Sequence, residues 1–146
     1  MTTNRDSVLY AQTFQIRGND FEHGGEVASK IKEVLRELGI DSAAIRRLSI
    51  ANFEAEMNVI MYADEGRFDF SVTAGRLEVL LSDHGRGIPD INLAMQEGWS
   101  TATPEMRARG FGAGLGLPNI KKNTDHFEIE SKVGVGTTLH YWVNLA

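Results

Sequence analysis

Apolar and polar residues repeat along the chain with two periods, which predict an alternation of strands and helices. Tyr10–Arg17 alternates apolar with polar side chains and predicts a strand. Across Val27–Leu38 the apolar residues recur at helical spacing, and Gly39 stands where a left-handed residue ends a helix. The pair Gly24–Gly25 weakens the preceding turn, so we expect this helix to begin near Glu26.

A second helix is predicted from Asp41 to about Ala63, where one apolar stripe again follows the helical period. Glu54 and Asn58 lie four residues apart, so they share a face of this helix outside the stripe. A polar pair of this kind is equally compatible with a solvated surface and with a binding site. For Glu56, by contrast, we expect a solvated position.

The second half of the chain predicts a β-hairpin, further helices and a closing hairpin. The expected strands are Arg67–Thr73, Arg76–Ser82, Phe127–Ser131 and Thr137–Asn144, and the expected helices are Asp90–Glu97 and Leu115–Asp125. A polar loop, 100–109, precedes the last helix and is typical of a functional lid. The fold class predicted is α+β, a two-layer sandwich of a mostly antiparallel sheet with helices on one face.

Composition narrows the class of protein. The 146 residues fit one domain, 1–146, in which we expect residues 1–8 to be flexible. The formal net charge of -5 argues against nucleic acid or an anionic membrane as a partner. Cysteine is absent and no apolar run is long enough to span a membrane, so a cytoplasmic location is expected.

Glycines are clustered in two parts of the chain. Because glycine has no Cβ, such clusters indicate a place where the backbone approaches a ligand closely. Asp83 is followed by Gly85 and Gly87, and a second run contains Gly110, Gly112, Gly114 and Gly116. Neither the Walker A pattern nor the dinucleotide fingerprint is present. What remains is a run of small residues before a helix, which suits an anion; taken alone, the run fits a surface hinge equally well.

Four sequence motifs, or boxes, taken together favour a ligand site over a surface hinge. They are Glu54 with Asn58, Asp83 with its glycines, the 110–116 run, and 134–138. In this order they resemble the nucleotide site of the GHKL superfamily, which has the Bergerat ATP-binding fold. Within it the chain is similar to the bacterial anti-sigma factor serine kinases and the stressosome switch kinase. The resemblance extends over nearly the whole chain from Asp20 onward.

The resemblance implies ATP or ADP and Mg²⁺ as ligands, and it assigns a role to each box. Asp83 would accept the adenine amine, with Gly85 and Gly87 beside the base and Thr137 sharing the contact through water. Asn58 would bind Mg²⁺, whose preferred ligands are oxygens. Gly110, Gly112, Gly114 and Gly116 would wrap the phosphates, and Glu54 would act as the catalytic base.

The implied function is a serine/threonine kinase of a bacterial partner-switching system that phosphorylates a serine on a small antagonist protein. A sigma factor or other regulator as a further partner, and a homodimer, are also compatible with the resemblance. One departure is Gly24–Gly25, which occupies the region where the related kinases carry an arginine. A non-catalytic, nucleotide-gated binding module is therefore the alternative, and the ATP domain of a histidine kinase ranks third.

The sequence indicates no function for the histidines. His84 follows Asp83 at a position that varies among the related kinases. His23, His126 and His140 have no evident partners in the sequence, so we expect them to be surface or strand residues without specific contacts.

Overall fold

The computed structural model describes residues 7–96 and 116–145. Within these ranges the chain forms five strands, four α-helices and one short 3-10 turn. In chain order they are β1 (Tyr10–Arg17), η1 (Phe21–His23), α1 (Glu26–Glu37), α2 (Ser42–Tyr62), β2 (Ala63–Val72), β3 (Arg76–Gly85), α3 (Ile91–Ala94), α5 (Gly116–Lys122), β4 (His126–Lys132) and β5 (Gly136–Asn144).

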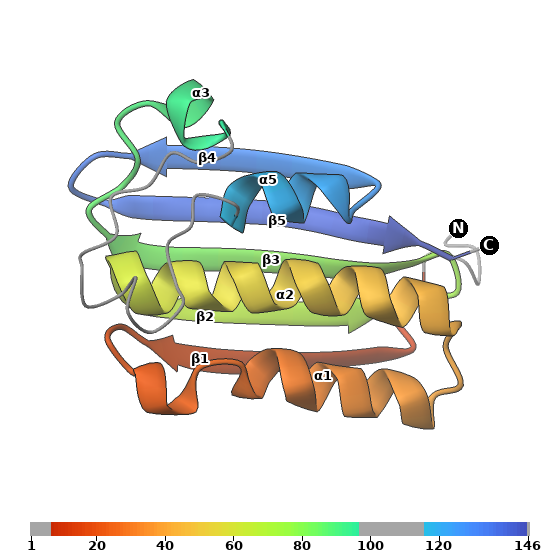
Figure 1. The fold of residues 1–146 in the computed structure, drawn as a ribbon. Coiled ribbons are helices and arrows are strands. Elements are labelled where there is room, and N and C mark those ends of the chain that lie inside the picture. The colour runs from red at the N-terminus through yellow and green to blue at the C-terminus, as the bar shows by residue number, and fades with distance from the viewer. Residues whose placement is uncertain (1–6, 97–115, 146) are drawn as a thin grey trace.

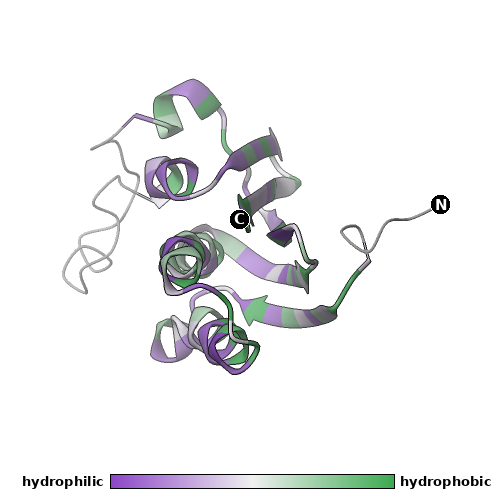
Figure 2. Cartoon of the chain, turned by 90° about the vertical axis from the view of Figure 1, so that its right-hand side faces the viewer, coloured by the Kyte–Doolittle hydropathy of each residue, from purple (hydrophilic) through white to green (hydrophobic). Residues whose placement is uncertain are grey.

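The five strands form one sheet in the order β1-β2-β3-β5-β4, and every neighbouring pair is antiparallel. Helices α1, α2 and α5 cover one face of this sheet (Figure 1). Figure 2 shows the same two layers from the side, with the helices together on one side of the strands. The predicted α+β sandwich with an antiparallel sheet is therefore confirmed.

The main boundary differences concern the first hairpin. Strand β2 begins at Ala63 rather than Arg67, because it pairs along its length with β1 on one side and β3 on the other. Strand β3 correspondingly continues past Ser82 to Gly85. Asp83 therefore lies within the paired strand, and its carboxylate is held by the sheet rather than by a free loop.

The core lies between the sheet and the helices. Its strand residues alternate along β2, β3 and β5, as the period of two requires, and the helices add one stripe each. The largest fully buried side chains include Phe68, Phe70, Leu77, Leu81, Leu139 and Tyr141 from the sheet and Ile31, Leu35, Leu48 and Ile120 from the helices. Tyr141 also donates its hydroxyl to Asn52 Oδ1 at 2.7 Å, so the central polar pair of the core is hydrogen-bonded.

Glu56 is buried, and the expectation of a solvated position was wrong. Only 2% of this residue is exposed. Its carboxylate accepts backbone N–H groups at the start of α1, from Gly25 at 3.0 Å, Val27 at 3.2 Å and Ala28 at 3.0 Å. These bonds replace a local cap, because the N-cap residue of α1 is a glycine without a side-chain hydrogen bond.

The glycine pair precedes α1 instead of weakening its first turn. Gly25 has a φ of 94°, in the left-handed region that glycine adopts without strain, and helix α1 begins at Glu26 as predicted. A Cβ at Gly24 would lie 2.9 Å from the sulfur of Met57 on α2. Glycine at both positions thus allows the segment that precedes α1 to pack closely against α2.

The Glu56 contacts predict a large cost for a nearly isosteric change. In Glu56→Gln an amide NH₂ replaces one acceptor oxygen and faces backbone donors that are buried. We expect the free energy of unfolding to fall by about 2–3 kcal/mol, measured by urea denaturation. Glu33→Gln makes the same change at an exposed position on α1 and should stay within about 0.5 kcal/mol of the parent. Equal effects of the two substitutions would contradict the anchoring role.

Candidate functional site

Asp83 is a half-buried carboxylate that is oriented by the neighbouring strand. Its Oδ1 accepts the backbone N–H of Thr137 on β5 at 2.9 Å. Burial raises the pKa of Asp83, while the Thr137 bond and the neighbouring His84 act in the opposite direction. Among the described residues, the hydrogen bond to this carboxylate is the one from Thr137 to Oδ1.

The glycines around Asp83 are required by close contacts within the chain. At Gly87, which has a φ of 76°, a Cβ would lie 2.4 Å from the carbonyl oxygen of Lys132. At Gly85 it would lie 2.9 Å from Cα of Ala63, and at Gly136 2.0 Å from the carbonyl oxygen of Asp83 itself. The backbone therefore packs tightly at Gly136 against Asp83, and at Gly85 and Gly87 against Ala63 and Lys132.

Ser131 and Thr137 tie the loop after β3 to the β4–β5 hairpin. The two hydroxyls lie 2.8 Å apart, and Ser131 Oγ also accepts the N–H of Ile88 at 2.7 Å. Backbone bonds from Gly85 N to Val135 O and from Gly134 N to Arg86 O complete the junction. Asp83 and Thr137 are thus brought together, as predicted, by a hydrogen-bonded loop rather than by the glycines alone.

Glu54 and Asn58 lie one turn apart on α2, both half-buried. The Glu54 carboxylate faces the start of α5, because a Cβ added to Gly116 would lie 3.4 Å from Glu54 Oε2. Burial raises the pKa of Glu54, and a hydrogen bond with the Asn119 side chain opposes this shift. Figure 1 shows α5 lying beside α2 over the sheet. The structure therefore brings Glu54 and Gly116 together, as the predicted site requires.

Part of the predicted site cannot be placed. Gly110, Gly112 and Gly114, together with the predicted lid 100–109, lie outside the described residues. Gly116 is described and forms the first residue of α5. The predicted helix Leu115–Asp125 is accordingly observed from Gly116 to Lys122.

Three residues of this region were missed by sequence reasoning. Asn119 is one turn beyond Gly116, so helical spacing from the glycine run was the available signal. Ser131 stands opposite Thr137 in the β4–β5 register, which only the pairing reveals. Arg86 lies with its guanidinium carbon 4.8 Å from the ring centroid of Tyr62, and no sequence signal indicated this contact.

His23 lies on the surface and His126 and His140 lie in strands, as expected, but the expectation that the three have no partners was wrong. Each lies next to a carboxylate, two of them within the sheet and one at the 3-10 turn. The pairs are His23 with Asp20 at 2.8 Å, His126 with Glu128 at 2.9 Å and His140 with Glu78 at 2.5 Å. The cross-strand pair could not be seen in the sequence because it depends on the register of β3 and β5.

The chain is similar to known proteins in sequence and in structure. A family described as Histidine kinase-like ATPase domain matches residues 19–141. Over 112 residues the chain is 33% identical to Serine/threonine-protein kinase RsbT of Bacillus subtilis (strain 168), which corresponds to 74% of this chain and 78% of that protein.

A solved structure supports the fold. The catalytic domain of histidine kinase ThkA superposes with a TM-score of 0.51 and 18% identity, covering 94% of this chain and 97% of that one. In the described part of the chain, no helix is long and apolar enough to cross a membrane. The chain belongs to the family of histidine kinase-like ATPase domains, with the GHKL-type architecture and a serine/threonine kinase among its relatives.

Proposed function

We propose that this protein is an ATP-dependent protein serine/threonine kinase of a bacterial partner-switching system. It would transfer the γ-phosphate of ATP to a serine on a small antagonist protein. The similarity to a serine/threonine kinase over three quarters of the chain supports the reaction class. The observation that carries the proposal is the position of Glu54, a half-buried carboxylate directed at the start of α5.

Asp83 is proposed to select adenine. Its Oδ1 is already occupied by the Thr137 N–H, which leaves Oδ2 to accept the exocyclic amine of the base. Guanine presents a carbonyl oxygen at that position, and two acceptors, this oxygen and the Asp83 carboxylate, cannot form a hydrogen bond with each other. Thr137, whose hydroxyl is held by Ser131, would share the adenine contact, and Gly85 and Gly87 would form the backbone around it.

Asn58 is proposed as the protein ligand of Mg²⁺. The donor set fits this cation, because an amide oxygen and a carboxylate lie on one face of α2, and Mg²⁺ prefers oxygen ligands while keeping several waters. When bound, Mg²⁺ would neutralise charge on the phosphates. Gly110, Gly112, Gly114 and Gly116 would provide backbone N–H groups to the phosphates.

Glu54 is proposed as the general base. It would accept the proton of the attacking serine hydroxyl as the oxygen bonds to the γ-phosphorus and the bond to ADP breaks. A raised pKa suits this role, because a more basic carboxylate accepts the proton more readily. Asn119 would keep the carboxylate oriented through its hydrogen bond.

We propose the kinds of protein that this kinase would contact, without naming individual partners. The antagonist would carry the phosphorylatable serine, and a sigma factor or downstream regulator would be released or bound according to its phosphorylation. A cytoplasmic location, a single domain over 1–146 and a homodimer belong to the same proposal. The acidic net charge supports protein partners rather than nucleic acid.

A non-catalytic nucleotide-gated binding module is the second candidate. The observation in its favour is the α1 entry, where related kinases carry an arginine and this chain has Gly24–Gly25. Because Gly25 is left-handed and its N–H is held by Glu56, a side chain could not be accommodated there without strain. Tight ADP-dependent binding of a partner without phosphate transfer would select this alternative.

Asp83→Asn tests the adenine site. The amide can still accept the Thr137 N–H through its oxygen, so the fold should persist, but its NH₂ would oppose the adenine amine. We expect binding of both ATP and ADP to be lost in calorimetry, because this contact does not involve the γ-phosphate. Asp64→Asn, an exposed position on β2, is the control. Micromolar affinity retained by Asp83→Asn would refute the assignment.

Glu54→Gln tests the base. Nucleotide binding should survive, whereas transfer to a partner serine should fall at least about 10²-fold. In the parent protein, burial raises the Glu54 pKa, so the ionised base is lost as the pH falls through that raised value. Transfer should therefore decline at a higher pH than an ordinary glutamate pKa of about 4.3 predicts. Unchanged transfer in Glu54→Gln would rule out this role.

Gly87→Ala and Gly134→Ala form a matched pair for the loop beside Asp83. Both glycines have left-handed φ values, 76° and 80°, so either alanine costs about 1–2 kcal/mol of stability. Only Gly87 faces a neighbour, Lys132 O at 2.4 Å, whereas Gly134 faces open space. We expect Gly87→Ala to lose further stability in urea and to weaken ADP binding about tenfold more than Gly134→Ala. Equal losses would show that the contact is unimportant for the site.

A further inference from the structure

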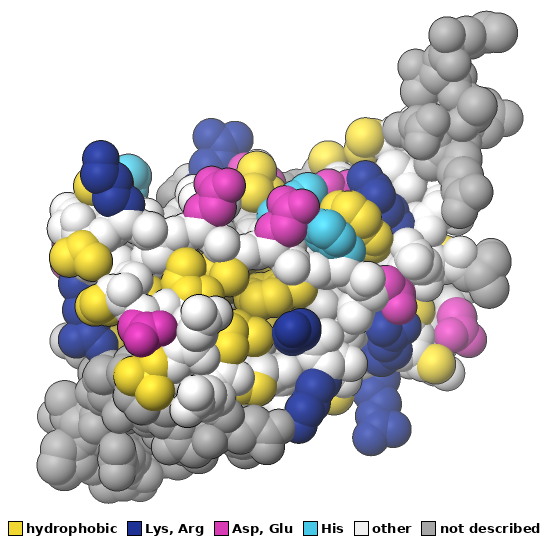
Figure 3. Space-filling view, turned by 90° about the horizontal axis from the view of Figure 1, so that it is seen from above, with side chains coloured by type: hydrophobic (Ala, Val, Ile, Leu, Met, Phe, Trp, Pro, Cys, Tyr) yellow, Lys and Arg dark blue, Asp and Glu magenta, His cyan; other side chains and the backbone are white. Residues whose placement is uncertain are grey.

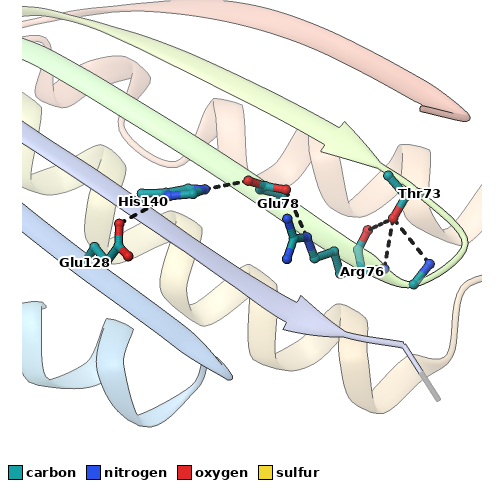
Figure 4. A network of polar contacts seen from close by, with 6 residues as sticks. Thr73, Arg76, Glu78, Glu128 and His140 are labelled. Atoms are coloured by element: carbon teal, nitrogen blue, oxygen red, sulfur yellow. Dashed lines mark hydrogen bonds and ion pairs between the residues drawn. The ribbon is translucent and has the colours of Figure 1, made fainter. Parts of the chain in front are cut away.

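Two histidines and a glutamate converge on the face of the sheet away from the helices. His126 and Glu128 lie on β4, and His140 lies on β5 directly opposite Glu128. One ligand atom from each of the three lies within 4.8 Å of the others. Figure 3 shows histidine and acidic side chains gathered on the surface, and Figure 4 shows that the His140 contacts lie on the outer face.

The Glu128 carboxylate lies between the two imidazoles. Its Oε1 is 2.9 Å from His126 Nε2, and its Oε2 is 3.6 Å from His140 Nδ1. Although close to Glu128, His126 Nε2 is shielded from solvent and has no hydrogen bond of acceptable geometry among the described residues. Close nitrogen and oxygen atoms that do not form a directed hydrogen bond are what two ligands of one cation would present.

A second carboxylate orients His140. His140 Nε2 is 2.5 Å from Glu78 Oε2, and Glu78 Oε1 accepts from Arg76 Nε at 3.0 Å (Figure 4). With the proton of the ring on Nε2 and directed to Glu78, the lone pair is on Nδ1, which faces Glu128. Histidine ligands of metals are commonly oriented by a carboxylate in this way.

The other imidazole is held by stacking. The His126 ring lies 3.9 Å from the Trp142 ring at an interplanar angle of 13°. The guanidinium carbon of Arg76 also lies 3.9 Å from the centroid of Trp142. Arg76 thus supports both histidines, one through Glu78 and the other through Trp142, so both rings are positioned before any ligand binds.

We propose that His126, Glu128 and His140 form a binding site for a divalent transition metal ion of the Zn²⁺ type, with water as the fourth ligand. Zn²⁺ accepts two imidazoles and a carboxylate at about 2.0–2.2 Å, which places tetrahedral ligand atoms about 3.3–3.5 Å apart. The observed separations, 2.9 Å to one oxygen of Glu128 and 3.6 Å to the other, lie on either side of this range, and the three ligand atoms lie within 4.8 Å of one another, so small side-chain movements would complete the tetrahedral set. Imidazole ligands favour Zn²⁺ over Mg²⁺, so this site differs in chemistry from the one proposed at Asn58.

Such a site would link the edge strand of the sheet to its neighbour. Strand β4 is the last in the sheet order and pairs only with β5 among the described strands. A cation held by ligands from both strands would stabilise this pairing in the folded chain but not in the unfolded one. Metal binding would therefore raise the melting temperature.

Titration of the untagged, nucleotide-free chain with Zn²⁺ tests the proposal. We expect one bound ion per chain in calorimetry, a higher Tm, and a tetrahedral visible spectrum when Co²⁺ replaces Zn²⁺. His126→Phe keeps an aromatic ring for Trp142, and His140→Gln keeps a hydrogen-bonding group for Glu78. Each removes one nitrogen ligand and should weaken Zn²⁺ binding at least about tenfold.

His23→Gln is the matched control, because it removes an exposed histidine next to a carboxylate outside the cluster. It should bind Zn²⁺ like the parent. The proposal is overturned if the double variant His126→Phe, His140→Gln binds Zn²⁺ as tightly as the parent, or if His23→Gln is weakened equally. It is also overturned if Zn²⁺ binds the parent without a tetrahedral Co²⁺ spectrum.

Discussion

Helix α2 contacts different partners on different sides, and the position of each candidate catalytic group follows from this packing. Its apolar stripe lies on the sheet, its Glu54 side faces α5, and its Glu56 side faces the start of α1. At about 100° per residue, Glu54 and Glu56 point in nearly opposite directions around the helix. Two carboxylates so close in sequence therefore serve different purposes, one at the candidate site and one in the structure.

Both of these carboxyl groups lose contact with water, but they receive different numbers of hydrogen bonds in return. Burial raises the pKa of both groups. In Glu56 three backbone N–H donors offset part of the cost of burying a negative charge, so they favour its ionised form. Glu54 has the Asn119 hydrogen bond and retains the capacity to accept a proton. This difference supports the choice of Glu54 as the reactive group.

The outer face of the sheet is organised by cross-strand pairs rather than by the core. A chain of contacts crosses three adjacent strands: Arg76 contacts Trp142 and Glu78, Glu78 contacts His140, and His140 contacts Glu128. Such contacts require the register of β3, β5 and β4, since a shift of one residue would move each side chain to the opposite face. The candidate metal site is thus a product of strand pairing at the far side of the molecule from the helices.

The sequence by itself determined the element order, the α+β class and the grouping of Glu54, Asn58 and Asp83 with glycines. Local periodicity and turn chemistry specify the first two features, because they depend on near neighbours in the chain, whereas the grouping of these site residues rests on the resemblance to the GHKL family. Periodicity identifies only one buried stripe, so it could not show that α1 covers Glu56 or that Asn119 reaches Glu54. Only the tertiary structure decided which polar side chains were desolvated and that His140 contacts Glu78 and Glu128. Those outcomes depend on contacts between residues as far apart in sequence as Glu78 and His140.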